Sequence, residues 1–157
     1  MKYRRLRSSG FTALELIVVT FVCGLIAGAG YFLLHPVSKQ MEQNNAERWL
    51  GLASMMQDLN HYVAENGDLP ADLPTKPTYI GTTKGMYNLC PALVPTFTVD
   101  LPLDPKYGFH TVESYCDTTG QNYFSAYQIS VDAKGMVTLA APHAEDGATI
   151  KLTRQYK

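Results

Sequence analysis

The sequence lacks the local patterns that most catalytic sites require. It has no nucleophile elbow, no glycine-rich phosphate loop and no cluster of paired carboxylates. Its four histidines are far apart, and none has a metal-ligand spacing to another: His35, His61, His110 and His143. Calcium would need a denser series of oxygen ligands than the turn carboxylates provide, namely Asp104, Asp117, Asp132, Glu145 and Asp146. We therefore expect no enzyme activity, no cofactor and no metal site.

Basic charge is scarce beyond the N-terminus. Of the thirteen lysines and arginines, four lie in the first ten residues, so residues 11–157 carry nine basic against fourteen acidic residues and a net charge of −5. A duplex-binding protein shows the opposite balance, and no basic patch interleaved with aromatic residues is present. Nucleic-acid binding is therefore not indicated.

Charged side chains are absent from Leu16 to Leu34, a run of nineteen residues. Counted from Phe11, the mostly apolar segment would form about 36 Å of helix, enough to cross a hydrocarbon core of about 30 Å with some tilt. Basic residues precede this run and none follows at its far end. This charge bias predicts a single-pass inner (cytoplasmic) membrane protein with a cytoplasmic N-terminus and an extracytoplasmic domain.

One carboxylate, Glu15, interrupts the start of the apolar segment. A charge at such a position costs about 2 to 3 kcal/mol on insertion scales, so it needs a partner or a purpose. A secretory signal peptide cut after Ala29 leaves Glu15 unexplained, and the apolar run continues beyond that site. A plain membrane tether also gives Glu15 no role. A third interpretation is a leader that is cut on the cytoplasmic side, before the apolar run.

The order of residues around Gly10 supports the third interpretation. A basic head, then Gly10, Phe11 and Thr12, then Leu14 and Glu15, resembles the cleavage and methylation motif of the type IV pilin and pseudopilin family. The resemblance implies that a prepilin peptidase/methyltransferase cuts between Gly10 and Phe11 and N-methylates Phe11. Ala13 and Leu14 depart from the commonest residues of the motif but keep its apolar character.

Elementary electrostatics agrees with this resemblance. A cut after Gly10 creates an α-ammonium group at Phe11, next to hydrocarbon, and Glu15 of the same or a neighbouring helix can neutralise it. The resemblance implies that the pairing is between subunits and sets their axial offset. It also implies three kinds of partner: membrane lipid before assembly, an inner-membrane assembly platform, and other pilin subunits in a homo- or heteropolymer.

Two of the three cysteines lie in the expected external part. Cys90 and Cys116 are twenty-six positions apart, and in an oxidising compartment two such cysteines form a disulfide more often than not. A closed loop of this size would contribute about 3 kcal/mol in the chain-entropy model. The alternative is two buried thiols. Cys23, within the apolar run, is interpreted as a small apolar residue.

After the apolar run, the spacing of apolar residues predicts one long helix from Phe11 to about Asn66. Its second half has a stripe at three- and four-residue steps: Met41, Trp49, Leu52, Met56, Leu59 and Val63. Pro36 would kink this helix without ending it, whereas Gly67 and Pro70 would end it. His61 falls on the polar side. An irregular connection follows, with a short helix near Pro91–Phe97.

Strands dominate the remainder. Runs rich in β-branched and aromatic residues predict four: Phe109–Tyr115, Tyr123–Val131, Met136–Ala141 and Thr149–Thr153. Asp132-Ala133-Lys134-Gly135 predicts a hairpin turn, and Glu145-Asp146-Gly147 predicts a second turn. Packed on the amphipathic helix, three or four antiparallel strands would bury five residues together: Trp49, Leu52, Met56, Phe124 and Ile129.

This arrangement is an α+β fold, and it agrees with the pilin fold that the resemblance implies. Asp100-Leu101-Pro102-Leu103-Asp104-Pro105 is also similar to a proline-rich loop of pseudopilins. The expected organisation is a leader (1–10), a transmembrane or filament-core helix (11–35) and a globular domain (36–157), the last divided into an amphipathic helix (37–66), a loop (67–106) and a sheet (107–154). The expected function is a structural subunit, major or minor, of a type IV pilus or a type II secretion-like filament. The alternative is a tethered binding domain that does not polymerise.

Overall fold

A computed structural model describes residues 12–111, 116 and 122–156 of the chain, without the side chains of residues 32–36. By internal contacts the chain divides into two compact units, Met1–Gln40 and Met41–Lys157. The first contains the start of a long helix. The second, called the domain below, contains the end of that helix and a sheet, in an α+β arrangement.

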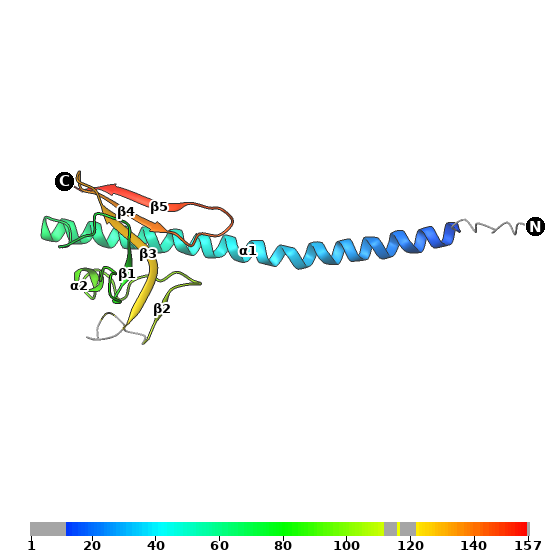
Figure 1. Cartoon of the computed structure of the whole chain (residues 1–157), viewed down its shortest axis with the longest axis horizontal. Helices are drawn as coiled ribbons and strands as arrows, with labels where there is room; N and C mark the ends of the chain where they lie inside the picture. Colours follow the sequence, from blue (N-terminus) through cyan, green and yellow to red (C-terminus); the bar gives the residue numbers. More distant parts are fainter. Residues whose placement is uncertain (1–11, 112–115, 117–121, 157) are drawn as a thin grey trace, which may run out of the picture. The chain divides into compact units, whose positions relative to one another are not determined.

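The long helix α1 spans Ala13–Asn66 (Figure 1). Thr12 caps its start, because the Glu15 N–H donates to Thr12 Oγ1 at 3.2 Å and the Leu16 N–H donates to the Thr12 carbonyl at 3.1 Å. Gly67 ends the helix with φ +78°, and its N–H donates to the Val63 carbonyl at 2.8 Å. The prediction of one helix that continues through Pro36 to Asn66 is confirmed, while Phe11 lies outside the described residues.

Within the described residues the sheet has five strands, one more than the sequence predicted: β1 (Thr78–Gly81), β2 (Phe109–His110), β3 (Tyr123–Val131), β4 (Met136–Ala141) and β5 (Ile150–Gln155). The strand order is β1-β3-β4-β5, β2 also pairs with β3, and every pairing is antiparallel. The bounds predicted for β3 and β4 are confirmed. β1 was missed, because it falls inside the segment interpreted as a loop. The predicted short helix is α2, at Cys90–Leu93.

Both predicted turns are present. In the β3–β4 turn, Gly135 has φ +76° and its N–H donates to the Asp132 carbonyl at 3.0 Å. The Asp132 carboxylate accepts the N–H groups of Lys134 and Met136, so the aspartate closes the hairpin through its side chain as well. The second turn has positive φ at Asp146 and Gly147.

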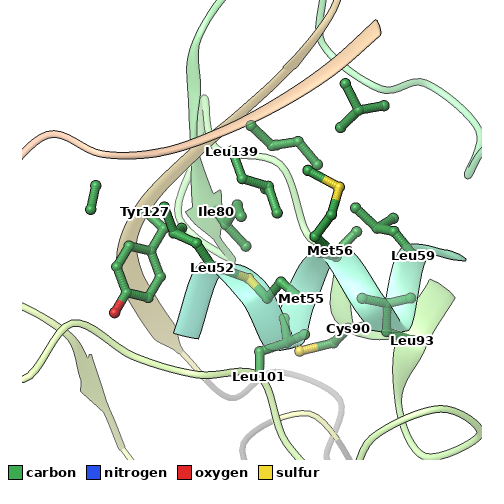
Figure 2. Close-up of a cluster of buried hydrophobic side chains, with 14 of the residues drawn as sticks. Leu52, Met55, Met56, Leu59, Ile80, Cys90, Leu93, Leu101, Tyr127 and Leu139 are labelled. Atoms are coloured by element: carbon green, nitrogen blue, oxygen red, sulfur yellow. The ribbon is translucent and has the colours of Figure 1, made fainter. Parts of the chain in front are cut away.

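The core of the domain lies between α1 and the sheet (Figure 2). Leu52, Met55 and Leu59 of α1 are fully buried against residues from the strands and α2, namely Ile80, Leu93, Tyr127, Ile129, Val137 and Leu139. Burial of Leu52, Met56 and Ile129 was predicted, and it is confirmed.

Two expected core residues lie elsewhere. The Trp49 side chain is 43 % exposed, because the neighbouring residue Arg48 takes the position that faces the domain. Phe124 is only half-buried, since it alternates with the buried Tyr123 and Ser125 along β3 and so lies on the other face of the sheet. On that face its ring contacts the rings of Tyr79 and Phe109.

Candidate functional site

The first candidate site is the uncovered apolar segment of α1, Ala13–Tyr31. This segment has a mean hydropathy of 2.1, none of it is buried, and it is long and apolar enough to cross a membrane. Leu14, Phe21 and Ile26 are 73 %, 67 % and 67 % exposed. Side chains of this kind are stabilised by about 1.5 to 3 kcal/mol each when they leave water. Covering this segment with lipid or protein would therefore be favourable.

One polar side chain of this segment, Thr20, is satisfied by the helix itself. The Thr20 hydroxyl donates to the Leu16 and Ile17 carbonyls at 2.9 and 3.0 Å, so this hydroxyl does not need a water molecule as its partner.

Gly24 and Gly28 are four residues apart, and a Cβ at either would meet nothing within 4 Å. Cys23 is a free, exposed thiol.

Glu15 lies in the first turn of α1, three residues after the capping Thr12. A threonine cap followed by glutamate at this spacing is a capping box, a signal that the sequence interpretation did not use. The negative charge is also favourable at the start of a helix. In the part of the chain that the structure describes, no ion pair involves the Glu15 carboxylate. The predicted cleavage residues, Gly10 and Phe11, lie outside the described residues.

The predicted disulfide is confirmed. Cys90, at the start of α2, is bonded to Cys116, and their Cα atoms are 5.3 Å apart. Cys90 is buried and belongs to the same core cluster as Leu59 and Leu93, so the bond joins Cys116 to the core of the domain.

A second cluster, the Arg48 network, connects α1 to two loops of the domain. The Arg48 guanidinium is fully buried and forms two hydrogen bonds with the Asp104 carboxylate, at 2.7 and 3.2 Å. Its third nitrogen lies 3.2 Å from Glu145 Oε2. Lys106 Nζ lies 2.7 Å from Glu145 Oε1, so the two cations and the two carboxylates alternate.

Amide groups complete the Arg48 network. Asn44 Nδ2 donates to Glu145 Oε2 at 2.7 Å, and Asn45 exchanges two hydrogen bonds with the Glu145 backbone at 2.9 and 3.0 Å. The Asp104 carboxylate also accepts the N–H groups of Lys106 and Tyr107. Each buried charge therefore has several partners, which is the condition under which a buried ion pair is tolerated.

The electrostatics of the Arg48 network keeps every member charged. Burial opposes ionisation of Asp104, but hydrogen bonds from Arg48 and from two backbone N–H groups outweigh it and lower the pKa of Asp104. The ammonium of Lys106 and the amide of Asn44, together with Arg48, lower the pKa of Glu145 to about 2. Burial opposes the charge of Arg48, yet its bonds to both carboxylates raise its pKa.

Sequence reasoning missed this network. Asp104 and Glu145 were interpreted as surface carboxylates, whereas Asp104 is buried and Glu145 is largely covered. The available signal was Arg48 itself, which lies four residues before Leu52 on the buried face of α1. Among the described residues, no three His, Cys, Asp or Glu side chains are close enough together to hold a metal ion.

No family model matches the chain, and neither the curated proteins nor the solved structures provide a match.

Proposed function

We propose that this chain is the precursor of a type IV pilin-like filament subunit. It is cut between Gly10 and Phe11, held in the inner membrane by the apolar segment with its domain outside the cytoplasm, and then assembled through that segment. The observation that supports this most directly is an apolar helix with no covered side chain and a single carboxylate in its first turn.

The domain does not need the apolar segment for its own core. Among the side chains of α1 that the structure describes, the buried ones belong to residues 48–59, and the core cluster contains these together with residues of the sheet and α2. The apolar segment is therefore available to partners outside this domain. Lipid can cover it before assembly, and helices of other copies can cover it afterwards, with Gly24 and Gly28 allowing close approach.

Glu15 then acquires a specific role. Lipid offers its carboxylate no counter-charge, and the described residues supply none. A cut after Gly10 would create an ammonium group at Phe11 of each copy. A salt bridge from Glu15 of one copy to Phe11 of the next would neutralise both charges and fix the offset between the two helices.

A second function is favoured by one observation, the spacing of Thr12 and Glu15 at the start of α1, which is the sequence pattern of a capping box. If capping is the whole purpose of Glu15, the chain is a membrane-tethered domain that does not polymerise. The Glu15→Gln variant separates the two functions, because glutamine serves in a capping box but carries no charge. The filament function predicts normal cleavage and loss of sedimentable polymer. The tether function predicts no effect of this variant.

The experiment uses the native host, with mass spectrometry of the N-terminus and sedimentation of sheared surface or periplasmic polymer. Glu42→Gln is the matched control, because it removes an exposed carboxylate of α1 outside the apolar segment. N-methyl-Phe11 together with polymer that is lost only in Glu15→Gln supports the proposal. An intact Met1 in the native chain, or full assembly of Glu15→Gln, would contradict it.

A further inference from the structure

A small cleft lies in the domain near the end of α1. It has a volume of about 360 Å³, at the low end of the roughly 300 to 1,000 Å³ typical of ligand sites. Its lining comes from α1, the loop after it, and the segment around α2: Tyr62, Pro70, Ala71, Asp72, Tyr87, Asn88, Pro91 and Ala92. Two aromatic rings, two prolines and one carboxylate thus share a single concave surface.

The two tyrosines of this cleft are held in place by the domain. The Tyr87 hydroxyl donates to the Ala71 carbonyl at 2.9 Å. The Tyr62 ring packs edge-on against Phe97, with ring centroids 5.8 Å apart. Because both side chains are fixed without a ligand, the cleft is pre-formed, and a ligand would not have to order them.

The charge of the cleft is negative and uncompensated. Asp72 is exposed, and no ion pair in the described part of the chain involves it. Burial of the Tyr87 ring raises the pKa of its hydroxyl, and the charge of the nearby Asp72 raises it further. The last turn of α1 has no basic side chain, so the partial negative charge at the end of the helix is not offset there.

Asp72 also has an unusual backbone, with φ +57°. A residue other than glycine in this conformation is uncommon, although aspartate and asparagine adopt it more readily than most. The conformation belongs to the loop that carries Asp72 to the cleft. It also means that Asn can replace Asp at this position without a new backbone strain.

We infer that this cleft binds an alkylammonium group, with the cation against the rings of Tyr62 and Tyr87 and beside the Asp72 carboxylate. Aromatic faces attract cations, and tyrosine rings with an adjacent carboxylate are suited to ammonium groups. The group can come from a small quaternary amine or from a lysine side chain, which share this chemistry. The assignment concerns the domain alone and holds whether or not the chain polymerises.

The test measures binding of four probes to the full chain in uncharged maltoside micelles, by ligand-observed NMR at constant ionic strength. Choline is compared with its neutral isostere 3,3-dimethylbutan-1-ol, and Nα-acetyl-lysine amide with the amide of Nα-acetyl-2-aminoheptanoic acid, in which a methyl group replaces the ammonium. We expect saturable binding of at least one cation, roughly tenfold tighter than that of its neutral isostere. The pair that shows this preference identifies the source as a quaternary or a primary amine.

Two variants locate the site. Asp72→Asn should weaken cation binding roughly fivefold, because it removes the charge and retains the backbone conformation. Tyr62→Leu should weaken it similarly by removing an aromatic face. Asp68→Asn, an exposed carboxylate that does not line the cleft, should change nothing. Equal binding of cations and neutral isosteres, no saturable binding of any cation, or unchanged binding in Asp72→Asn would overturn the inference.

Discussion

The two halves of α1 share one backbone helix and differ in what surrounds them. From Ala13 to Tyr31 no side chain is covered, and the only charged residue is Glu15. From Arg48 to Leu59 one face is buried in a core, and a fully buried guanidinium connects that face to two loops. Apolar residues in the first half are therefore uncovered within the described part of the chain, whereas those in the second half contribute to the folding stability of the domain.

The largest effect on folding stability is expected for substitution of Arg48, in the half of α1 that belongs to the domain. Arg48→Met leaves the Asp104 carboxylate buried without its cation, which should lower the free energy of unfolding by about 3 to 5 kcal/mol. Urea unfolding can be followed by fluorescence, because the only tryptophan, Trp49, lies in the domain half of α1 and reports on the domain.

Two further variants test the reason for that loss. Lys106→Met removes the exposed cation of the network and should lower stability much less than Arg48→Met, because solvent screens this ion pair. Adding Asp104→Asn to Arg48→Met should recover part of the lost stability, since asparagine keeps a hydrogen-bond acceptor without a charge. An Arg48→Met variant as stable as the wild type would show that the network does not hold the loops.

The next prediction compares the same substitution in the two halves. Leu52→Ala removes a fully buried side chain and should lower the free energy of unfolding of the domain by about 2 to 5 kcal/mol. Leu25→Ala removes a side chain that is 59 % exposed in the uncovered half and should change it by less than about 0.5 kcal/mol. Equal effects of the two substitutions would contradict the division into two units.

The smallest predicted effect is the loss of folding stability of the domain at acidic pH. The pKa of Glu145 in the folded chain is about 2, against an ordinary value of 4.5, and that of Asp104 is also lowered. Because the unfolded chain takes up these protons first, the stability they contribute is present above the ordinary pKa and is lost as the pH falls toward the folded-state pKa.

Stability should therefore fall between about pH 4.5 and about pH 2, and Glu145→Gln should make this fall shallower. Urea midpoints measured across that range for wild type, Glu145→Gln and the exposed control Glu42→Gln give the comparison. A fall of the same steepness in Glu145→Gln would mean that other carboxylates dominate acid unfolding.

Sequence reasoning was sufficient to predict those elements whose local residue pattern specifies a single structure. The hairpin turn at Asp132–Gly135 needs a residue that tolerates positive φ, and Gly135 has φ +76°. The bounds of β3 and β4 follow from β-branched and aromatic residues on either side of that turn. β1 was missed because it has only four residues, follows Pro77 and ends in Gly81, so it shows no period of its own. Pairing with β3 defines it.

The sequence alone determined the long helix, its apolar start with Glu15 and both turns, because each depends on neighbouring residues. It favoured a Cys90–Cys116 disulfide over two buried thiols, and the structure contains the disulfide. Only the tertiary structure decided that Arg48 is buried while Trp49 is 43 % exposed, and that Asp104 and Glu145 come together at α1. A helical period gives the width of an apolar stripe, but the side chains of the facing loops decide which edge of that stripe is covered.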